Sequence, residues 1–363
     1  LGSDNGIGVA TIMSLLASDD IPHPPLEALF TIDEETGMTG AAAIRPGQLE
    51  GDILLNLDTE EETELTIGCA GGVDVTATMT VPMVDAGPDH GLEIRLRGLT
   101  GGHSGMDIHL GRGNANKLMN RLLGSVPGLQ LGRLDGGGLR NASPRESTAL
   151  VRVPDVDQAR DQLAECFRIL SSEYAATDPD LRLEVVDAER PDRALDPEFQ
   201  LRLLAAIAAC PSGIHRMSPD IEDLVQTSNN LARVEVKDGH LIVLCLTRSA
   251  VDSEKMAHAE EIEGVFSLLG AVVEFAGSYP GWTPRPEASI VKLMEQLYQE
   301  RFGEPPTVAA CHAGLECGII GRHYPEMEMI SFGPNIRGAH SPDEKVQVES
   351  VERFWGFLLE TLE

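Results

Sequence analysis

The spacing of hydrophobic residues predicts alternating helices and strands in the first part of the chain. Residues 4–16 predict a loop that turns into a helix, because apolar positions recur there at helical intervals. Residues 26–32 and 53–57 are short apolar runs followed by acidic residues, and they predict strands; residues 37–44 predict a short helix. Strands that are buried on both faces and alternate with helices are typical of a largely parallel sheet.

The pattern changes after about residue 72 and changes back at residue 279. The intervening segment predicts helices at 116–123, 156–170, 197–209 and 253–269, with strands at 92–96, 181–186 and 241–246. The last segment predicts a helix at 288–301, a strand at 327–332 and a helix at 348–362. We therefore expect an α/β fold: a domain with a mostly parallel central sheet and helices on both faces, formed by 1–72 and 279–363, interrupted by an inserted α+β domain at 73–278.

Length and composition are consistent with a globular protein of two domains. The 363 residues exceed the size at which one hydrophobic core normally stops growing. The hydrophobic content of 42% is ordinary, and no apolar run approaches the ~18 residues that span a bilayer. Because the chain opens with Leu-Gly-Ser-Asp and not with methionine, we expect the natural N-terminus to lie upstream.

Charge and cysteine content exclude several classes of partner and site. The formal charge is −30, from 58 acidic and 28 basic residues. Such an acidic surface repels nucleic acid and anionic membrane, so we expect neither as a partner. The six cysteines are scattered and form no Cys-x-x-Cys pair, which argues against a disulfide framework and against a cysteine-rich zinc site. We expect buried thiols in a reducing cytoplasm.

Five acidic or histidine residues sit next to strand or helix ends, where ligands gather in parallel sheets. They are Asp4, the adjacent Glu34 and Glu35, Asp58 and His340. Carboxylates with an imidazole suit divalent ions, and a pair of ions ~3.5–4 Å apart needs a bridging carboxylate and terminal ligands. Four of these residues would supply such a set and leave Glu34 free to take a proton. Each residue alone is more often a cap, a solvated acid or a loop histidine, so the residues by themselves leave both interpretations open.

Nine short segments of the chain carry a resemblance. They are LGSDNGIGVA (1–10), TIDEETGMTGA (31–41), ILLNLDTEE (53–61), GCAGG (68–72), GGHSGMDIHLGRGNANKL (101–118), LRNASPRE (139–146), YPGW (279–282), HAGLECG (312–318) and GAHSPDE (338–344). Together they resemble the bacterial aminoacyl-histidine dipeptidases, also called cytosolic non-specific or carnosine-cleaving dipeptidases. Each segment alone is a weak signal, whereas nine in the same order are specific. The family consists of co-catalytic zinc peptidases with a catalytic domain and a dimerising lid domain, which implies that 73–278 is the lid.

The resemblance implies a role for each candidate in the catalytic domain. Asp4 would bridge two divalent metal ions, zinc in the first place, although cobalt and manganese suit the same ligands. Glu35, Asp58 and His340 would be terminal ligands, and Glu34 would be the general base and acid.

The resemblance also implies substrate contacts from the lid. His103 resembles a histidine that reaches into the partner subunit's site to hold the oxyanion, and Arg248 resembles an arginine that pairs with the substrate's C-terminal carboxylate. Asn141 and Asn230 are weaker candidates for substrate contact. For His103 an ordinary loop histidine, and for Arg248 a surface salt bridge, stay open as alternatives. The implied partners are a dipeptide with a free N-terminus, including Xaa-His types such as carnosine, and a second copy of the chain in a homodimer.

One feature of the family is missing from these residues. Its first metal ligand belongs to a His-x-Asp motif a few tens of residues before the bridging aspartate, but only three residues precede Asp4, and none of the ten histidines is followed two places later by aspartate. We therefore expect the chain as given to be N-terminally incomplete and inactive alone, and the predicted function to be that of the complete protein. The alternatives are a related amidohydrolase, such as a deacylase or desuccinylase, and a catalytically inactive peptide-binding dimer.

Overall fold

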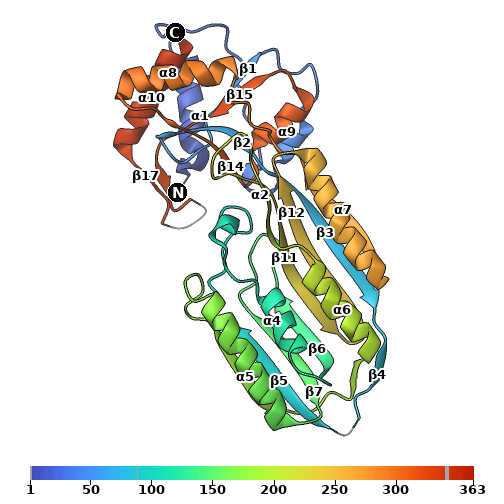
Figure 1. Cartoon of the computed structure of the whole chain (residues 1–363). Coiled ribbons are helices and arrows are strands. Elements are labelled where there is room, and N and C mark those ends of the chain that lie inside the picture. Colours follow the sequence, from blue (N-terminus) through green and yellow to red (C-terminus); the bar gives the residue numbers. More distant parts are fainter. Residues whose placement is uncertain (1, 88, 340–342) are drawn as a thin grey trace. The chain divides into compact units, whose positions relative to one another are not determined.

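The computed structural model describes residues 2–87, 89–339 and 343–363, without the side chains of Glu35 and Thr36. The chain divides into two compact units (Figure 1). Unit 1 consists of Leu1–Gly71, Ser218–Leu224 and Tyr279–Glu363, and unit 2 consists of Gly72–Met217 and Val225–Ser278.

Unit 1 is built on a four-stranded sheet in the order β1-β15-β2-β14. The strands are β1 (Ile53–Asn56), β2 (Glu64–Cys69), β14 (Thr307–Cys311) and β15 (Glu328–Ser331). Two of the three neighbouring pairs are parallel, and β15 meets β2 antiparallel. The helices are α1 (Ser3–Leu16), α2 (Glu34–Gly37), α3 (Thr39–Ala43), α8 (Ser289–Phe302), α9 (Glu316–His323) and α10 (Val348–Leu362), and the short strands β16 (Ile336–Arg337) and β17 (Lys345–Val346) pair with each other. The main core of this unit joins apolar residues of α1, α8 and α10 to those of the sheet.

One predicted strand of unit 1 is wrong. The predictions for 4–16, 53–57, 288–301, 327–332 and 348–362 are confirmed. Residues 26–32, however, form no strand, because within the described part of the chain the sheet ends at β1 and no strand pairs with them. Their apolar side chains are accordingly open to solvent, with Phe30 48% and Ile32 73% exposed. Apolar composition makes a segment suitable for a strand, but only a neighbouring strand can satisfy its backbone groups.

Unit 2 is a nine-stranded sheet with four helices packed against it (Figure 1). The main path runs β13-β3-β12-β11-β6-β7-β5-β8, and β10 pairs with β11. The strands are β3 (Gly71–Thr80), β5 (His90–Arg97), β6 (Gln130–Gly137), β7 (Ser147–Val153), β8 (Arg182–Ala188), β10 (Gly213–Met217), β11 (Val225–Lys237), β12 (His240–Ser249) and β13 (Val272–Tyr279), and a separate ribbon joins β4 (Met83–Asp85) to β9 (Arg193–Leu195). The helices are α4 (Ala115–Gly124), α5 (Val156–Glu173), α6 (Pro197–Ala209) and α7 (Asp252–Leu269), with the 3-10 turn η1 (Ile108–Leu110).

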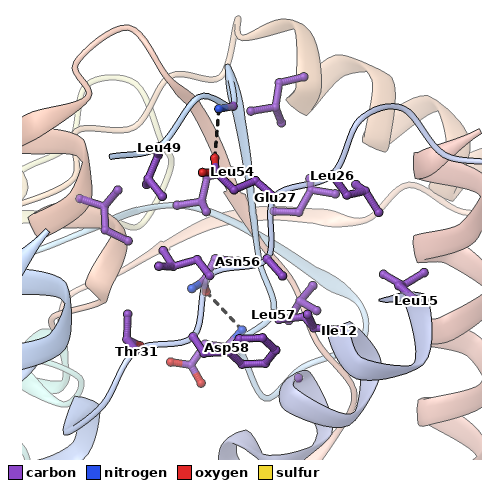
Figure 2. Close-up of a pocket in the computed structure, with 18 of the residues that line it drawn as sticks. Ile12, Leu15, Leu26, Glu27, Thr31, Leu49, Leu54, Asn56, Leu57 and Asp58 are labelled. Atoms are coloured by element: carbon purple, nitrogen blue, oxygen red, sulfur yellow. Dashed lines mark hydrogen bonds between the residues drawn. The ribbon is translucent and has the colours of Figure 1, made fainter. Parts of the chain in front are cut away.

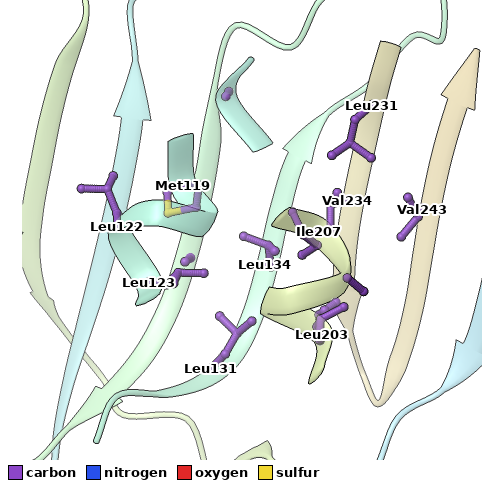
Figure 3. Close-up of a cluster of buried hydrophobic side chains, with 14 of the residues drawn as sticks. Met119, Leu122, Leu123, Leu131, Leu134, Leu203, Ile207, Leu231, Val234 and Val243 are labelled. Carbon is purple, nitrogen blue, oxygen red and sulfur yellow. The ribbon is translucent and has the colours of Figure 1, made fainter. Parts of the chain in front are cut away.

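The core of unit 2 lies between this sheet and its helices. Figure 3 shows Met119 and Leu122 of α4, Ile207 of α6, Leu134 of β6 and Val234 of β11, which belong to one buried cluster. The helices predicted at 116–123, 156–170, 197–209 and 253–269 are confirmed, as are the strands at 92–96, 181–186 and 241–246.

Three of the unit 2 helices begin at side-chain caps that the sequence contains locally. Asn114, Asp155 and Asp196 accept hydrogen bonds from backbone amides in the first turns of α4, α5 and α6. Each such cap contributes about 1 kcal/mol to helix stability. These helices therefore have starting points that are fixed by neighbouring residues and not by distant packing alone.

The structure also bears on membrane insertion and disulfide formation. None of the helices in the described ranges is both long and apolar enough to cross a membrane. All six cysteines lie in the described ranges and none is in a disulfide, while Cys69, Cys210, Cys245 and Cys317 are buried.

Candidate active site

Asn5 holds two predicted metal ligands, Asp4 and Asp58, on neighbouring segments. Its Oδ1 accepts a hydrogen bond from Gly8 N at 2.9 Å, so Asn5 caps the regular part of α1, and Asp4 lies just before that cap in a non-helical conformation. Its Nδ2 donates to Leu57 O at 2.9 Å, directly before Asp58. One side chain thus starts the helix and ties that start to the end of β1.

Asn56 fixes the backbone at Asp58 from the strand side. Its Oδ1 accepts from Asp58 N at 3.2 Å (Figure 2). The same oxygen accepts from Ser331 Oγ at 2.5 Å. Because Ser331 belongs to β15, the turn that carries Asp58 is held by the parallel pair β1 and β15.

Glu34 follows a strained backbone turn. Asp33 has a φ of 64°, in the left-handed region, which costs a non-glycine residue of order 1–3 kcal/mol. Thr39 Oγ1 donates to Asp33 Oδ2 at 2.7 Å and supports this turn. Gly40 packs so closely on the preceding segment that a Cβ there would lie 2.6 Å from Ile32 N. Strain of this kind is concentrated at functional sites, where the surrounding structure maintains it.

Asp4, Glu34 and Asp58 line one cavity of about 1030 Å³ within unit 1. Figure 2 shows Asp58 and Thr31 at one end of this cavity, with the apolar Leu15 and Leu26 farther along its wall. No lysine, arginine or histidine is among the described residues that line it. The sequence-predicted carboxylates Asp4, Glu34 and Asp58 therefore share one space.

Glu316 is a further carboxylate on this wall, to which the sequence assigned no role. It is 7% exposed, and its Oε2 accepts from Thr31 Oγ1 at 2.8 Å. Its buried Oε1 has no hydrogen-bond partner in the part of the chain that the structure describes. Burial raises the pKa of this carboxyl, and the bond from Thr31 only partly opposes that rise. The sequence could have pointed to Glu316 only through its place in the segment HAGLECG. The burial of its side chain could not be predicted, because it arises only in the folded chain.

Two predicted ligands, the side chain of Glu35 and His340, lie outside the described residues. Glu344, shortly after His340, is described: its Oε1 accepts from Ser3 N at 2.6 Å and from Asp4 N at 3.3 Å. The last residue of the GAHSPDE segment therefore contacts the backbone of Ser3 and Asp4.

The donor set fits divalent metal ions. Carboxylates from three separate segments line the cavity, and the buried Oε1 of Glu316 lacks a hydrogen-bond partner. Such oxygens are ligands for hard or borderline divalent ions, which would neutralise their charge.

His103 in unit 2 is held in one protonation state. Its Nδ1 accepts hydrogen bonds from Gly105 N at 3.2 Å and from Met106 N at 3.0 Å. A nitrogen that accepts from two amides cannot carry the proton, so the neutral ring carries it on Nε2. Burial, and then the charge of Arg248, lower the pKa of His103, whereas Asp107 raises it. His103 is thus prepared to donate a hydrogen bond from Nε2.

The other lid candidates surround the same loop. Asn230 is 1% exposed, and its Nδ2 donates to Arg140 O and Ala142 O, each at 2.9 Å. Between these two residues, Asn141 O accepts from Ser104 N at 2.7 Å. Both side-chain hydrogens of Asn230 are therefore used to hold the segment that pairs with the His103 loop. Arg248 is 5% exposed, so it is not a surface residue.

Comparison with known proteins identifies the family of the chain. Residues 3–363 match the family described as "Peptidase family M20/M25/M40". The chain belongs to this family. It is 40% identical to the cytosol non-specific dipeptidase of Escherichia coli (strain K12) over 369 residues, which cover 100% of this chain and 76% of that protein. This confirms the resemblance described from the sequence.

Solved structures confirm the predicted fold class. The aminoacylhistidine dipeptidase from Vibrio alginolyticus has a TM-score of 0.94 and 41% identity, over 100% of this chain and 76% of that one. The aminopeptidase PepT from Bacillus cereus has a TM-score of 0.51 and 15% identity, over 100% of this chain and 71% of that one, and shows the shared fold alone.

Proposed function

We propose that the protein hydrolyses dipeptides with a free N-terminus, including Xaa-His dipeptides such as carnosine, with two divalent metal ions held in unit 1. One observation carries this proposal: Asp4, Glu34 and Asp58 line a single cavity in a chain that matches a dipeptidase along its whole length. In the proposal Asp4 would bridge the two ions, and Glu35, Asp58 and His340 would be terminal ligands. Zinc is the first choice, and cobalt or manganese would suit the same donors.

Glu34 moves the proton in this reaction. Bound ions would polarise the substrate carbonyl and lower the pKa of an attacking water. The Glu34 carboxylate accepts a proton from that water as its oxygen attacks the peptide carbonyl carbon, and then delivers the proton to the nitrogen of the leaving amine. The strained turn at Asp33 supports this role because it fixes the start of α2, where Glu34 lies.

Unit 2 acts as the lid in this proposal. His103 donates its Nε2 hydrogen to the oxyanion that develops at the substrate carbonyl. The two hydrogen bonds that Nδ1 accepts from backbone amides support this role, because they place the proton on Nε2. Arg248 binds the C-terminal carboxylate of the substrate. Asn141 and Asn230 help to shape this part of the lid, with Asn230 acting on the backbone. His103 would serve the site of a partner subunit, so the protein would work as a homodimer in the cytoplasm.

The test is a Glu34→Gln variant of the protein expressed from its complete gene and loaded with zinc. We expect kcat for carnosine to fall by about 10²–10⁴-fold, the usual contribution of a general base, while the zinc content is unchanged. Glu50→Gln, an exposed carboxylate on the wall of the same cavity, is the control and should keep full activity. Turnover of N-acetyl amino acids but not of dipeptides would reject the proposal in favour of a related deacylase.

A further inference from the structure

A second group of metal-ligating side chains lies in unit 2. His215, His258 and Glu261 each offer a ligand atom, and these atoms all lie within 4.8 Å of one another. Among the residues that the structure describes, no other three His, Cys, Asp or Glu side chains form such a compact group. These three residues belong to β10 and α7, and none of them lines the cavity in unit 1.

A β-bulge brings His215 to the helix. The pairing of β10 with β11 shifts between Ile214, which faces Ser228, and Arg216, which faces Thr227. His215 is the extra residue in this shift, and a bulge redirects the side chain of the residue that it inserts. The His215 ring consequently packs on that of His258, with a distance of 4.0 Å between ring centroids.

The helix presents the other two ligands on one face. His258 and Glu261 are three positions apart on α7, so their side chains are neighbours on its surface. His258 Nδ1 lies 2.7 Å from Glu261 Oε2. The ring of His258 is 2% exposed, yet its Nε2 has no hydrogen-bond partner among the described residues. A neutral ring that donates Nδ1–H to Glu261 leaves on Nε2 a buried lone pair, which is the ligand form of histidine.

Glu254, one turn before His258 on α7, attaches the helix to both strands beside the cluster. It accepts hydrogen bonds from Gln226 Nε2 at 2.6 Å and from Thr227 Oγ1 at 2.9 Å, and it pairs with Arg216. Arg216, which follows the bulge, and the facing strand β11 are therefore both attached to α7. His215 and Glu261, which are exposed, remain able to adjust their side chains.

We propose that His215, His258 and Glu261 bind a borderline divalent transition-metal ion, Zn²⁺ in the first place, at a site separate from the catalytic cavity. Two imidazoles and one carboxylate with an open fourth position are a ligand set that zinc uses in proteins. Tetrahedral zinc at ~2.0–2.1 Å from each nitrogen would hold the nitrogens about 3.3 Å apart. Because the ligand atoms lie within 4.8 Å of one another, each separation must close by at most about 1.5 Å, which rotation of the exposed His215 and Glu261 side chains can supply. The ion would join the bulged strand β10 to α7.

The test compares zinc binding by the intact protein with that by a His215→Asn variant. We expect the variant to bind one equivalent of Zn²⁺ fewer, or to bind that equivalent at least ~10-fold more weakly, measured by titration against a chromophoric chelator. Glu261→Gln should weaken binding of the same equivalent by roughly 10–100-fold, because it removes the carboxylate of the group. His240→Asn, an exposed histidine of β12 in the same unit, should bind as the intact protein does.

One outcome of this test is decisive against the proposal. Equal zinc stoichiometry and affinity in the intact protein and in His215→Asn would overturn the proposal. Because His215 is exposed, its replacement should leave the circular dichroism spectrum unchanged, so a loss of zinc cannot be attributed to unfolding. The readout is binding and not hydrolysis, so a protein without dipeptidase activity would leave this result interpretable.

Discussion

Asp178 holds both ends of the loop that carries His103, and its replacement by asparagine should destabilise unit 2. Its carboxylate is 2% exposed. Oδ1 accepts from Thr100 N at 2.8 Å, and Oδ2 accepts from Gly113 N and from Thr177 Oγ1, each at 2.8 Å. Asparagine has the same shape, but it replaces one of the two accepting oxygens with an NH2 donor.

The three hydrogen bonds give the size of the effect. If the asparagine oxygen faces Gly113 N and Thr177 Oγ1, its amide nitrogen faces Thr100 N, which loses its partner at a cost of about 1–3 kcal/mol. The two remaining bonds lose their charge assistance, about 1 kcal/mol each. Part of this loss is offset because a buried charge is removed. We expect the free energy of unfolding of unit 2 to fall by about 2–4 kcal/mol.

Urea unfolding measures this loss of stability. The two tryptophans of the chain, Trp282 and Trp355, both lie in unit 1, so tryptophan fluorescence reports on unit 1. The transition of unit 2 should therefore move in far-UV circular dichroism more than in tryptophan fluorescence. Asp180→Asn is the control: it makes the same change of charge two residues away at an exposed position. If the two variants differ by less than about 0.5 kcal/mol, which is the usual range for surface substitutions, the assigned role of Asp178 is refuted.

Two further predictions concern the candidate site. Protonation of His103 breaks the two hydrogen bonds that its Nδ1 accepts from backbone amides. Burial, and then the charge of Arg248, lower the pKa of His103 below the ordinary 6.5. The contribution of neutral His103 to folding stability is therefore complete above pH 6.5 and is lost as the pH falls through the lower pKa of the folded state. Urea titrations between pH 7.5 and 5 should show this slope, and His103→Gln should reduce it. Gly40→Ala places a Cβ 2.6 Å from Ile32 N, so it should displace the Glu34 turn and lower kcat more than Glu50→Gln does; unchanged kinetics would contradict the close packing.

The helices of unit 2 could be predicted because their information is local. Apolar spacing gave the buried faces of α4 and α6, and the caps Asn114 and Asp196 stand immediately before them. The sheet was harder to predict from the sequence, since the long strand β11 is recognisable mainly through its pairing with β6, β10 and β12. The strand predicted at 26–32 fails for the same reason, because a strand depends on a partner that its own residues do not specify.

The candidate site divides in a similar way. The types of residue that bind metal or move protons could be chosen from the sequence, because carboxylates at strand ends suit that chemistry. Their environment could not be predicted: burial of Glu316 and of His258 follows from packing by residues far away in the chain. The bulge that turns His215 toward His258 depends on the register of β10 against β11, which a local pattern does not determine.

Several residues beside the candidate ligands hold backbone groups in place. Asn5 caps the regular part of α1 and donates a hydrogen bond to the carbonyl of Leu57, directly before Asp58. Asp33 has a left-handed backbone conformation directly before Glu34. The side-chain amide of Asn230 donates to two backbone carbonyls. A site that must hold its groups within about 0.5 Å requires such supports. Changes at these positions should therefore alter catalysis without removing any group that contacts the substrate. The sequence segments around the candidate ligands therefore contain residues that set the backbone geometry as well as residues that supply the chemistry.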